Sequence, residues 1–177
     1  MTTSFRSVRP AAGEFLPYYG TYIDRVPDGD IVETLDRQIG DTLSLIRSIP
    51  EANGDKRYAA DKWSIREVVG HVIDAERIFT YRALRFGRAD TTPVPGFDEN
   101  AYVANAPFSK VSLANLADEF EHVRRAAVHF FGNLDGDAFA RRGSANGAEI
   151  SVRALAFIMA GHESHHMNVL RTRYLRA

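Results

Sequence analysis

Three histidines are the residues of this chain whose type and spacing could carry chemistry. His162 and His166 stand four apart in the segment GHESHHMNVL, and His71 stands alone in VVGHVIDAERIF. Residues four apart on an α-helix share one face, one turn above the other. If the helix of His71 packs against that face, three imidazoles can meet at one divalent metal ion. Three protein ligands leave a coordination position open, as in catalytic metal sites.

His165 is a competing ligand, because it stands three residues from His162. At about 100° per residue, His166 lies about 40° from His162 and His165 about 60° away on the other side. The smaller angle favours His166, and we expect His165 at the rim of the site. His122 and His129, on the preceding predicted helix, are interpreted as surface residues.

The alternative to a metal site is a set of ordinary core histidines. A lone histidine on an apolar helix face, such as His71, is more often a satisfied core residue than a ligand. Two inward imidazoles without partners would each cost roughly 1 to 3 kcal/mol, and a shared metal would remove that cost. The pair and the third histidine together therefore favour a metal site in a helical core.

Composition limits the chemistry further. The 177 residues include no cysteine, 45% are hydrophobic, and the formal net charge is −1. A metal must therefore be held by histidine, carboxylate or water, and a thiol in the reaction must come from outside. The balanced charge gives no reason to expect nucleic acid or an anionic membrane as a partner. No signal-peptide pattern and no apolar run of about 18 residues occur, so we expect a cytoplasmic protein.

Helical periodicity dominates the chain and predicts an all-α fold. Apolar residues recur at steps of three and four in four segments, which cover about residues 30–49, 64–87, 112–132 and 152–174. The clearest helix start has Ser64 as N-cap, Glu67 three residues on, and Trp63 with Val68 as a hydrophobic staple. We expect one four-helix-bundle domain over residues 1–177, with 1–17 as an N-terminal extension.

The connection between the second and third helices predicts the topology of the bundle. It runs over about residues 87–111, carries three prolines and has no sustained period. Antiparallel neighbours need only short loops, so about 25 residues indicate a crossover that leaves these two helices parallel. The predicted topology is up-down-down-up. The segment GNLDGDAFARRGSANGAEI, before the last helix, could hold a short hairpin but is expected to form an irregular turn.

Three stretches of the sequence resemble one known family. They are KWSIREVVGHVIDAERIF, PGFDENAYV and SVRALAFIMAGHESHHMNVLRTRYL. With the order of the helices, they make residues from about Tyr18 to Leu175 similar to the DinB-like, or bacillithiol-transferase-like, four-helix-bundle metalloproteins. The resemblance implies a three-histidine metal site, and the ligands carried over are His71, His162 and His166.

The resemblance and the open coordination position together suggest several activities. The leading expectation is a thiol S-transferase, in which the metal activates a low-molecular-weight thiol of bacillithiol or mycothiol type for attack on an electrophile. The alternatives are a non-catalytic, metal-stabilised protein of the stress or damage response, and a metal-dependent hydrolase. Zinc is the first expectation for the metal, with nickel, cobalt, iron or manganese as alternatives.

Four further residues are candidates for supporting roles. Asp74 and Glu163 could orient an imidazole or move a proton, although a solvated charge on a helix face is the favoured interpretation of each. Phe97 and Tyr102 could line a pocket over the metal, or simply pack the crossover onto the bundle. A homodimer is also plausible for a helical bundle of this size.

Overall fold

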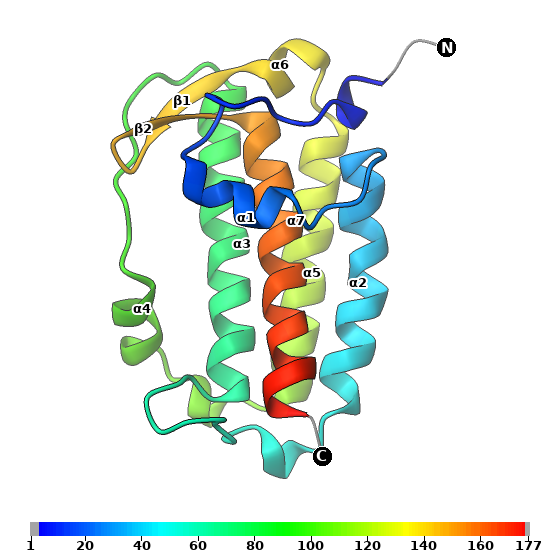
Figure 1. The fold of residues 1–177 in the computed structure, drawn as a ribbon, viewed down its shortest axis with the longest axis vertical. Helices are drawn as coiled ribbons and strands as arrows, with labels where there is room; N and C mark the ends of the chain where they lie inside the picture. The colour runs from blue at the N-terminus through cyan, green and yellow to red at the C-terminus, as the bar shows by residue number, and fades with distance from the viewer. Residues whose placement is uncertain (1–3, 176–177) are drawn as a thin grey trace.

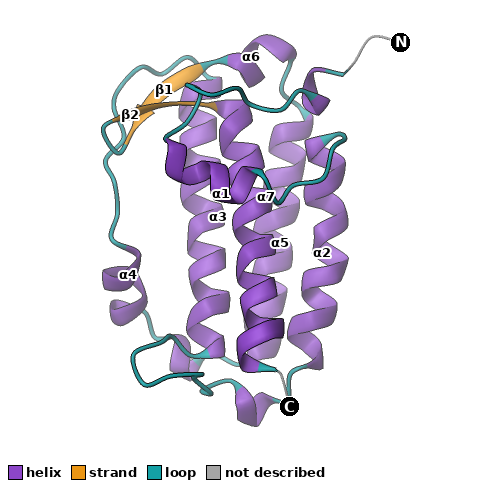
Figure 2. Ribbon diagram, in the orientation of Figure 1, coloured by secondary structure: helices purple, strands orange, loops and turns teal. Residues whose placement is uncertain are grey.

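Four long helices form a bundle in the computed structural model, which describes residues 4–175 (Figures 1 and 2). They are α2 (Ile31–Ser48), α3 (Ile65–Gly87), α5 (Leu113–Gly132) and α7 (Val152–Val169). The predicted all-α four-helix bundle is confirmed.

Short elements connect and cover these helices. The α-helical ones are α1 (Gly20–Ile23), α4 (Glu99–Asn105) and α6 (Gly136–Ala140), and the strands are β1 (Arg142–Ala145) and β2 (Ala148–Ser151). Single 3₁₀ turns cover Phe5–Ser7, Pro17–Tyr19, Glu51–Asn53 and Phe108–Lys110, and α7 continues as a π-helical turn over Leu170–Tyr174.

The direction of the helices follows the predicted up-down-down-up order. In Figure 1, α3 and α5 both run upward, and α2 and α7 run downward. The connection from α3 to α5 returns along the outside of the bundle and carries α4. A connection of this length lets α3 and α5 lie side by side and parallel.

Side-chain caps explain where the four helices begin. Ser64 and Glu67 form a complete capping box at the start of α3. Asp30, Ser112 and Ser151 accept hydrogen bonds from backbone N–H groups in the first turns of α2, α5 and α7. The predicted helix starts therefore agree with the observed ones to within about a residue.

The segment before α7 forms the hairpin rather than the irregular turn. Strands β1 and β2 pair antiparallel, with Arg142 opposite Ser151 and Ala145 opposite Ala148. The two turn residues, Asn146 and Gly147, have φ angles of 54° and 75°. An Asn-Gly pair tolerates positive φ at both positions, as a tight hairpin turn requires.

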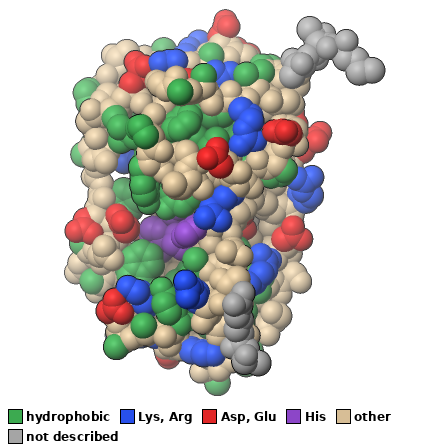
Figure 3. All heavy atoms as spheres, viewed as in Figure 1, with side chains coloured by type: hydrophobic (Ala, Val, Ile, Leu, Met, Phe, Trp, Pro, Cys, Tyr) green, Lys and Arg blue, Asp and Glu red, His purple; other side chains and the backbone are tan. Residues whose placement is uncertain are grey.

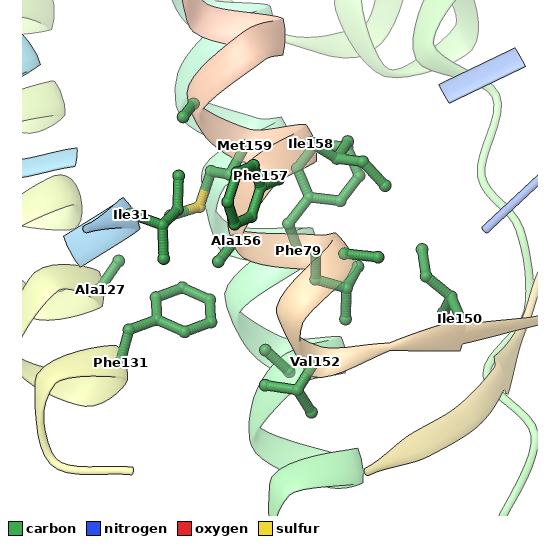
Figure 4. Packing of buried hydrophobic residues seen from close by; sticks show 14 of the residues in the cluster. Ile31, Phe79, Ala127, Phe131, Ile150, Val152, Ala156, Phe157, Ile158 and Met159 are labelled. Atoms are coloured by element: carbon green, nitrogen blue, oxygen red, sulfur yellow. The ribbon is translucent and has the colours of Figure 1, made fainter. Parts of the chain in front are cut away.

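A layer of charged and polar side chains crosses the bundle between two apolar clusters. Ile31, Phe131 and Met159 belong to one cluster, and Figure 4 shows them converging from α2, α5 and α7. Ile39 and Phe120 belong to the other. The layer itself contains Gln38, Thr42, Glu76, Arg124 and Glu163. It lies at the level of the candidate site.

The predicted N-terminal extension lies against the bundle in its described part. Glu14 is 3% exposed and accepts hydrogen bonds from Arg153 at 2.5 Å and from Ser151 at 2.7 Å. This ties the segment before α1 to the start of α7. Within residues 4–175, no helix is long and apolar enough to cross a membrane.

Candidate metal centre

The three predicted ligands lie close to one another. His71 comes from the second turn of α3, and His162 and His166 come from the adjacent helix α7. The Nε2 atoms of His71 and His162 are 3.0 Å apart, and one ring nitrogen of each of the three histidines lies within 4.8 Å of the others. His71 and His162 are each 6% exposed, and His166 is half-buried. The structure therefore brings the three imidazoles together.

The 3.0 Å spacing between the ring nitrogens of His71 and His162 suits two ligands of one metal ion. Two nitrogens bound to the same ion at about 2.0 to 2.1 Å lie roughly 3.0 to 3.4 Å apart for ordinary coordination angles. Apart from the contact between His71 and His162, no hydrogen bond within residues 4–175 engages any of the three rings. A metal ion would therefore give a common partner to three imidazoles that have no other hydrogen-bond partner among residues 4–175.

Burial keeps the three imidazoles in the neutral form that binds metals. Desolvation lowers the pKa of His71 to about 4. Desolvation and the neighbouring His71 and His165 lower the pKa of His166 to about 3. Desolvation, with the other three histidines adding to it, holds the pKa of His162 well below its ordinary value. The site is thus prepared for a cation without any carboxylate ligand.

These shifts predict how acid affects the metal-free protein. The folded pKa values of His71 and His166 lie below the ordinary value of 6.5, so below about pH 6.5 the unfolded chain binds more protons than the folded one. The stability that the neutral histidines contribute should therefore be fully present above about pH 6.5, and it should fall as the pH drops towards 4. Urea unfolding of chelator-treated protein at pH 7, 6 and 5 measures this loss. His71→Ala should flatten the dependence, and an unchanged slope in that variant would contradict the assignment.

Two glycines let other segments close over the histidines. A side chain at Gly161, directly before His162, would meet the backbone carbonyl of Tyr22 in α1 at 2.0 Å. A side chain at Gly70, directly before His71, would meet the ring of Phe108 at 2.4 Å. The absence of a Cβ at these positions therefore allows α1 and the crossover to contact the two ligand-bearing helices.

Gly161→Ala is expected to destabilise the protein although alanine is the better helix former. Helix propensity alone would favour alanine by about 1 kcal/mol. The new Cβ would overlap backbone atoms of Tyr22, which cannot rotate away as a side-chain end can. Gly40→Ala, in the interior of α2 with no atom within 4 Å of the added Cβ, is the matched control and should be stabilising. Thermal melts of both variants measure the difference, and equal shifts would show that the approach of α1 is not tight.

The other histidines occupy the places expected for them. His165 is half-buried beside the group, with its ring centroid 5.0 Å from that of His166, and lies outside the set of converging nitrogens. His122 and His129 are exposed on α5. The interpretation of these two as surface residues is confirmed.

The two candidate helper carboxylates do not join the histidines. Asp74 is half-buried and lies 3.8 Å from Arg77. Glu163 is buried in the polar layer, where it accepts a hydrogen bond from Thr42 of α2. Burial raises the pKa of Glu163, and the nearby charge of Arg124 offsets only part of this effect. Glu163 thus links α7 to α2 and is not a free charge on a helix face.

The larger of two hollows at the histidine group has a volume of about 370 Å³. It is lined by His71 and His162 and walled by Tyr22, Phe79 and Phe97, among others. Figure 3 shows histidine side chains in a depression of this face, among hydrophobic side chains. Phe97 thus lines the pocket, which is one of the two interpretations that the sequence allowed. Tyr102 contacts Phe97 but lines a neighbouring hollow.

A smaller hollow of about 250 Å³ reaches the group at His166. It is lined by His165, His166, Trp63 and Tyr174, among others. The ring centroid of Trp63, the one tryptophan of the sequence, lies 4.7 Å from that of His71. Its fluorescence can therefore report on metal binding.

Sequence reasoning missed Tyr22 as a site residue. Its ring centroid lies 5.3 Å from that of His162, and its hydroxyl is 2.9 Å from the hydroxyl of Tyr18. Burial raises the pKa of the Tyr22 phenol, and the neighbouring Tyr18 adds a smaller effect in the same direction. The phenol therefore stays protonated at neutral pH. Helix α1 is only four residues long, and nothing in its sequence indicates that it packs beside α7.

Fold and site together define a four-helix bundle with a group of three histidines, two buried and one half-buried, that could hold a divalent metal. The sequence model of the DinB superfamily matches residues 34–170. The chain therefore belongs to the DinB superfamily, and the resemblance read from the sequence is confirmed.

Two similar proteins add detail. A protein of Oceanobacillus iheyensis, named "Putative metal-dependent hydrolase OB0413", is 27% identical over 139 residues, which cover 77% of each chain. The solved structure of YfiT from Bacillus subtilis matches with a TM-score of 0.67 and 14% identity, over 93% of each chain. YfiT is described as a probable metal-dependent hydrolase with an unusual four-helix bundle topology. At this identity the likeness to YfiT shows the shared fold alone.

Proposed function

We propose that this chain is a divalent-metal-dependent enzyme in which His71, His162 and His166 bind the metal. Its reaction is the transfer of a low-molecular-weight thiol of bacillithiol or mycothiol type to an electrophilic substrate. Membership of the DinB superfamily, the metal-dependent names of the relatives and the convergence of three neutral imidazoles support the metal.

The metal would supply Lewis acidity, which lowers the pKa of a thiol or a water molecule at its remaining position. Zinc is the first candidate, because three imidazoles and one open position are typical of catalytic zinc sites. Nickel, cobalt, iron and manganese accept the same ligands. The absence of cysteine from the chain means that any thiol must be a second substrate.

The observation that favours transfer is that two separate hollows reach the histidine group. The larger contacts His71 and His162, and the smaller contacts His166. A reaction between two organic molecules needs two binding places that meet at the reacting atoms. One hollow would take the thiol and the other the electrophile, and hydrolysis would need only one of them.

The transfer balances without a further reactant. The thiol gives up its S–H proton, its sulfur bonds to the electrophilic carbon, and the bond from that carbon to the leaving group breaks. The leaving group departs with the electron pair and takes up the proton. We propose that the protonated phenol of Tyr22, which lies beside His162, donates a hydrogen bond to that group.

A metal-dependent hydrolase is the second candidate, because both relatives carry that description. In this case water replaces the thiol: its oxygen bonds to the carbon or phosphorus under attack, and its proton leaves with the departing group. The residues proposed to hold the metal would be the same.

The two candidates are separated by adding thiols to protein loaded with Co²⁺. Transfer predicts a thiolate-to-metal absorption band, and faster conjugation of cysteine or bacillithiol to an aryl chloride than occurs without protein. His162→Ala should lose both effects. Hydrolysis of aryl esters without thiol, and no spectral response to thiols, would favour the hydrolase and contradict the transferase. If the protein shows neither a response to thiols nor ester hydrolysis, both candidates are contradicted.

A further inference from the structure

Arg82 is a buried arginine in the wall of the larger hollow. It is 3% exposed and lines the same hollow as His71 and His162. Arg82 lies eleven residues after His71 on α3, and eleven steps of about 100° return to within about 20° of the same face. The two residues therefore face the same side of α3, about three turns or roughly 16 Å apart along its axis. Ala75 and Phe79 lie between them along the hollow.

Arg82 has no acidic partner within residues 4–175. Its Nη2 donates to the carbonyl of Pro95 at 3.1 Å, and its guanidinium lies 5.9 Å from the ring centroid of Phe97. Its Nε is buried and has no hydrogen-bond partner among the described residues. Glu99 lines the same hollow but is exposed, and no ion pair joins it to Arg82.

The other two buried arginines of the described chain are compensated. Arg124 makes a two-pronged ion pair with Glu76 at 2.6 and 2.8 Å. Arg66 pairs with Glu51 at 2.5 Å and with Asp55 at 2.8 Å. Arg82 is thus the exception in this bundle, since it is buried as a cation without an anion.

An uncompensated buried charge is costly, and it is more costly than an apolar residue of similar volume at the same place. Burial lowers the pKa of Arg82, and the neighbouring Tyr19 offsets this only in part. Guanidinium nevertheless keeps its proton in proteins. Such a group, at the wall of an open hollow, is suited to pair with an anion that arrives from solution.

We infer that the substrate of the larger hollow is an organic anion, whose carboxylate or phosphate pairs with Arg82 while its reacting bond lies at the histidine group. The inference deepens the proposed function and rests on it for the position of the reacting bond. The aromatic walls formed by Tyr19, Tyr22, Phe79 and Phe97 fit a flat apolar body between the two ends. The volume of about 370 Å³ limits this body to a small molecule.

The test compares benzoate, phenyl phosphate and neutral benzamide by ligand-detected NMR with the zinc-loaded protein. The wild-type chain should prefer one or both anions to benzamide, and the stronger of the two identifies the anionic group. Arg82→Gln should weaken anion binding by roughly tenfold to a hundredfold, as expected for loss of a charged hydrogen bond, and leave benzamide unchanged. Arg82→Lys should retain part of the preference.

Arg85→Gln is the matched control. Arg85 lies less than one turn further along α3, pairs with Asp90 and does not line the larger hollow. This variant should bind benzoate as the wild type does. Binding of both anions that is equal in wild type and Arg82→Gln, or equal to benzamide binding in the wild type, would overturn the inference.

Two measurements separate failure of this inference from failure of the metal proposal. Metal content should be the same in Arg82→Gln and wild type, because Arg82 is not among the converging ligands. The dependence of benzoate binding on Arg82 should also persist after chelator treatment. If zinc does not bind but this dependence persists, the anion site stands and the metal proposal falls. Arg82→Gln should melt no lower than the wild type, since it removes an unpaired buried charge.

Discussion

His162→Ala is expected to lower the affinity for Zn²⁺ or Co²⁺ by more than a hundredfold. Loss of a residue that only supports a ligand typically costs roughly 10- to 100-fold in metal affinity, and loss of a ligand should exceed that. His162 is central to the group, because its ring lies 4.9 Å from that of His71 and 4.5 Å from that of His166. Two imidazoles on separate helices would remain, without the chelating pair of α7.

Quenching of Trp63 fluorescence by Co²⁺ measures this affinity, because the Trp63 ring packs on His71. His165→Ala is the matched control: its side chain is on the same helix and contacts His166, yet lies outside the converging set. It should bind the metal nearly as the wild type does. Equal affinities in His162→Ala and wild type, or a larger loss in His165→Ala, would reverse the ligand assignment.

Glu76→Gln is expected to destabilise the protein by roughly 3 to 5 kcal/mol, the usual consequence of removing one partner from a buried ion pair. The side chains of Arg124 and Glu76 are 0% and 2% exposed, so Arg124 would keep a charge that water cannot reach. For a chain of this size, such a loss lowers the melting temperature by roughly 6 to 20 °C.

Arg77→Gln is the control for this variant. Arg77 lies on the same helix and pairs with Glu119 at 2.7 Å, but its side chain is 48% exposed. Exposed pairs contribute about 0 to 1 kcal/mol. Replacing Glu76 and Arg124 together by leucine should recover much of the stability, since neither partner of this pair is then left as an unpaired buried charge. Similar losses for Glu76→Gln and Arg77→Gln would mean that the polar layer is open to water.

The sequence predicted the bundle because its signals are local. Helix period and caps such as Ser64 and Ser151 fix four helices and their starts. The i, i+4 spacing of His162 and His166 fixes their common face. The long connection then predicts that α3 and α5 are parallel. Each of these inferences needs only neighbouring residues, and each agrees with the structure.

The surroundings of the site were harder to predict, because they depend on contacts between distant segments. Tyr22 reaches His162 only because α1 packs at Gly161. Helix α4 has seven residues, too few to show a helical period. One signal was available and overlooked: Arg82 continues the apolar stripe of Ala75 and Phe79, and a charge at a core position indicates either a buried ion pair or a ligand site.

The central claim is that the three histidines together hold one divalent metal. Elemental analysis of the wild-type protein, after loading with Zn²⁺ and removal of the excess, tests it most directly. We expect about one metal ion per chain in the wild type and in His165→Ala, and none retained in His71→Ala, His162→Ala or His166→Ala. A wild-type chain that retains no metal, or a histidine variant that retains a full equivalent, would contradict the claim.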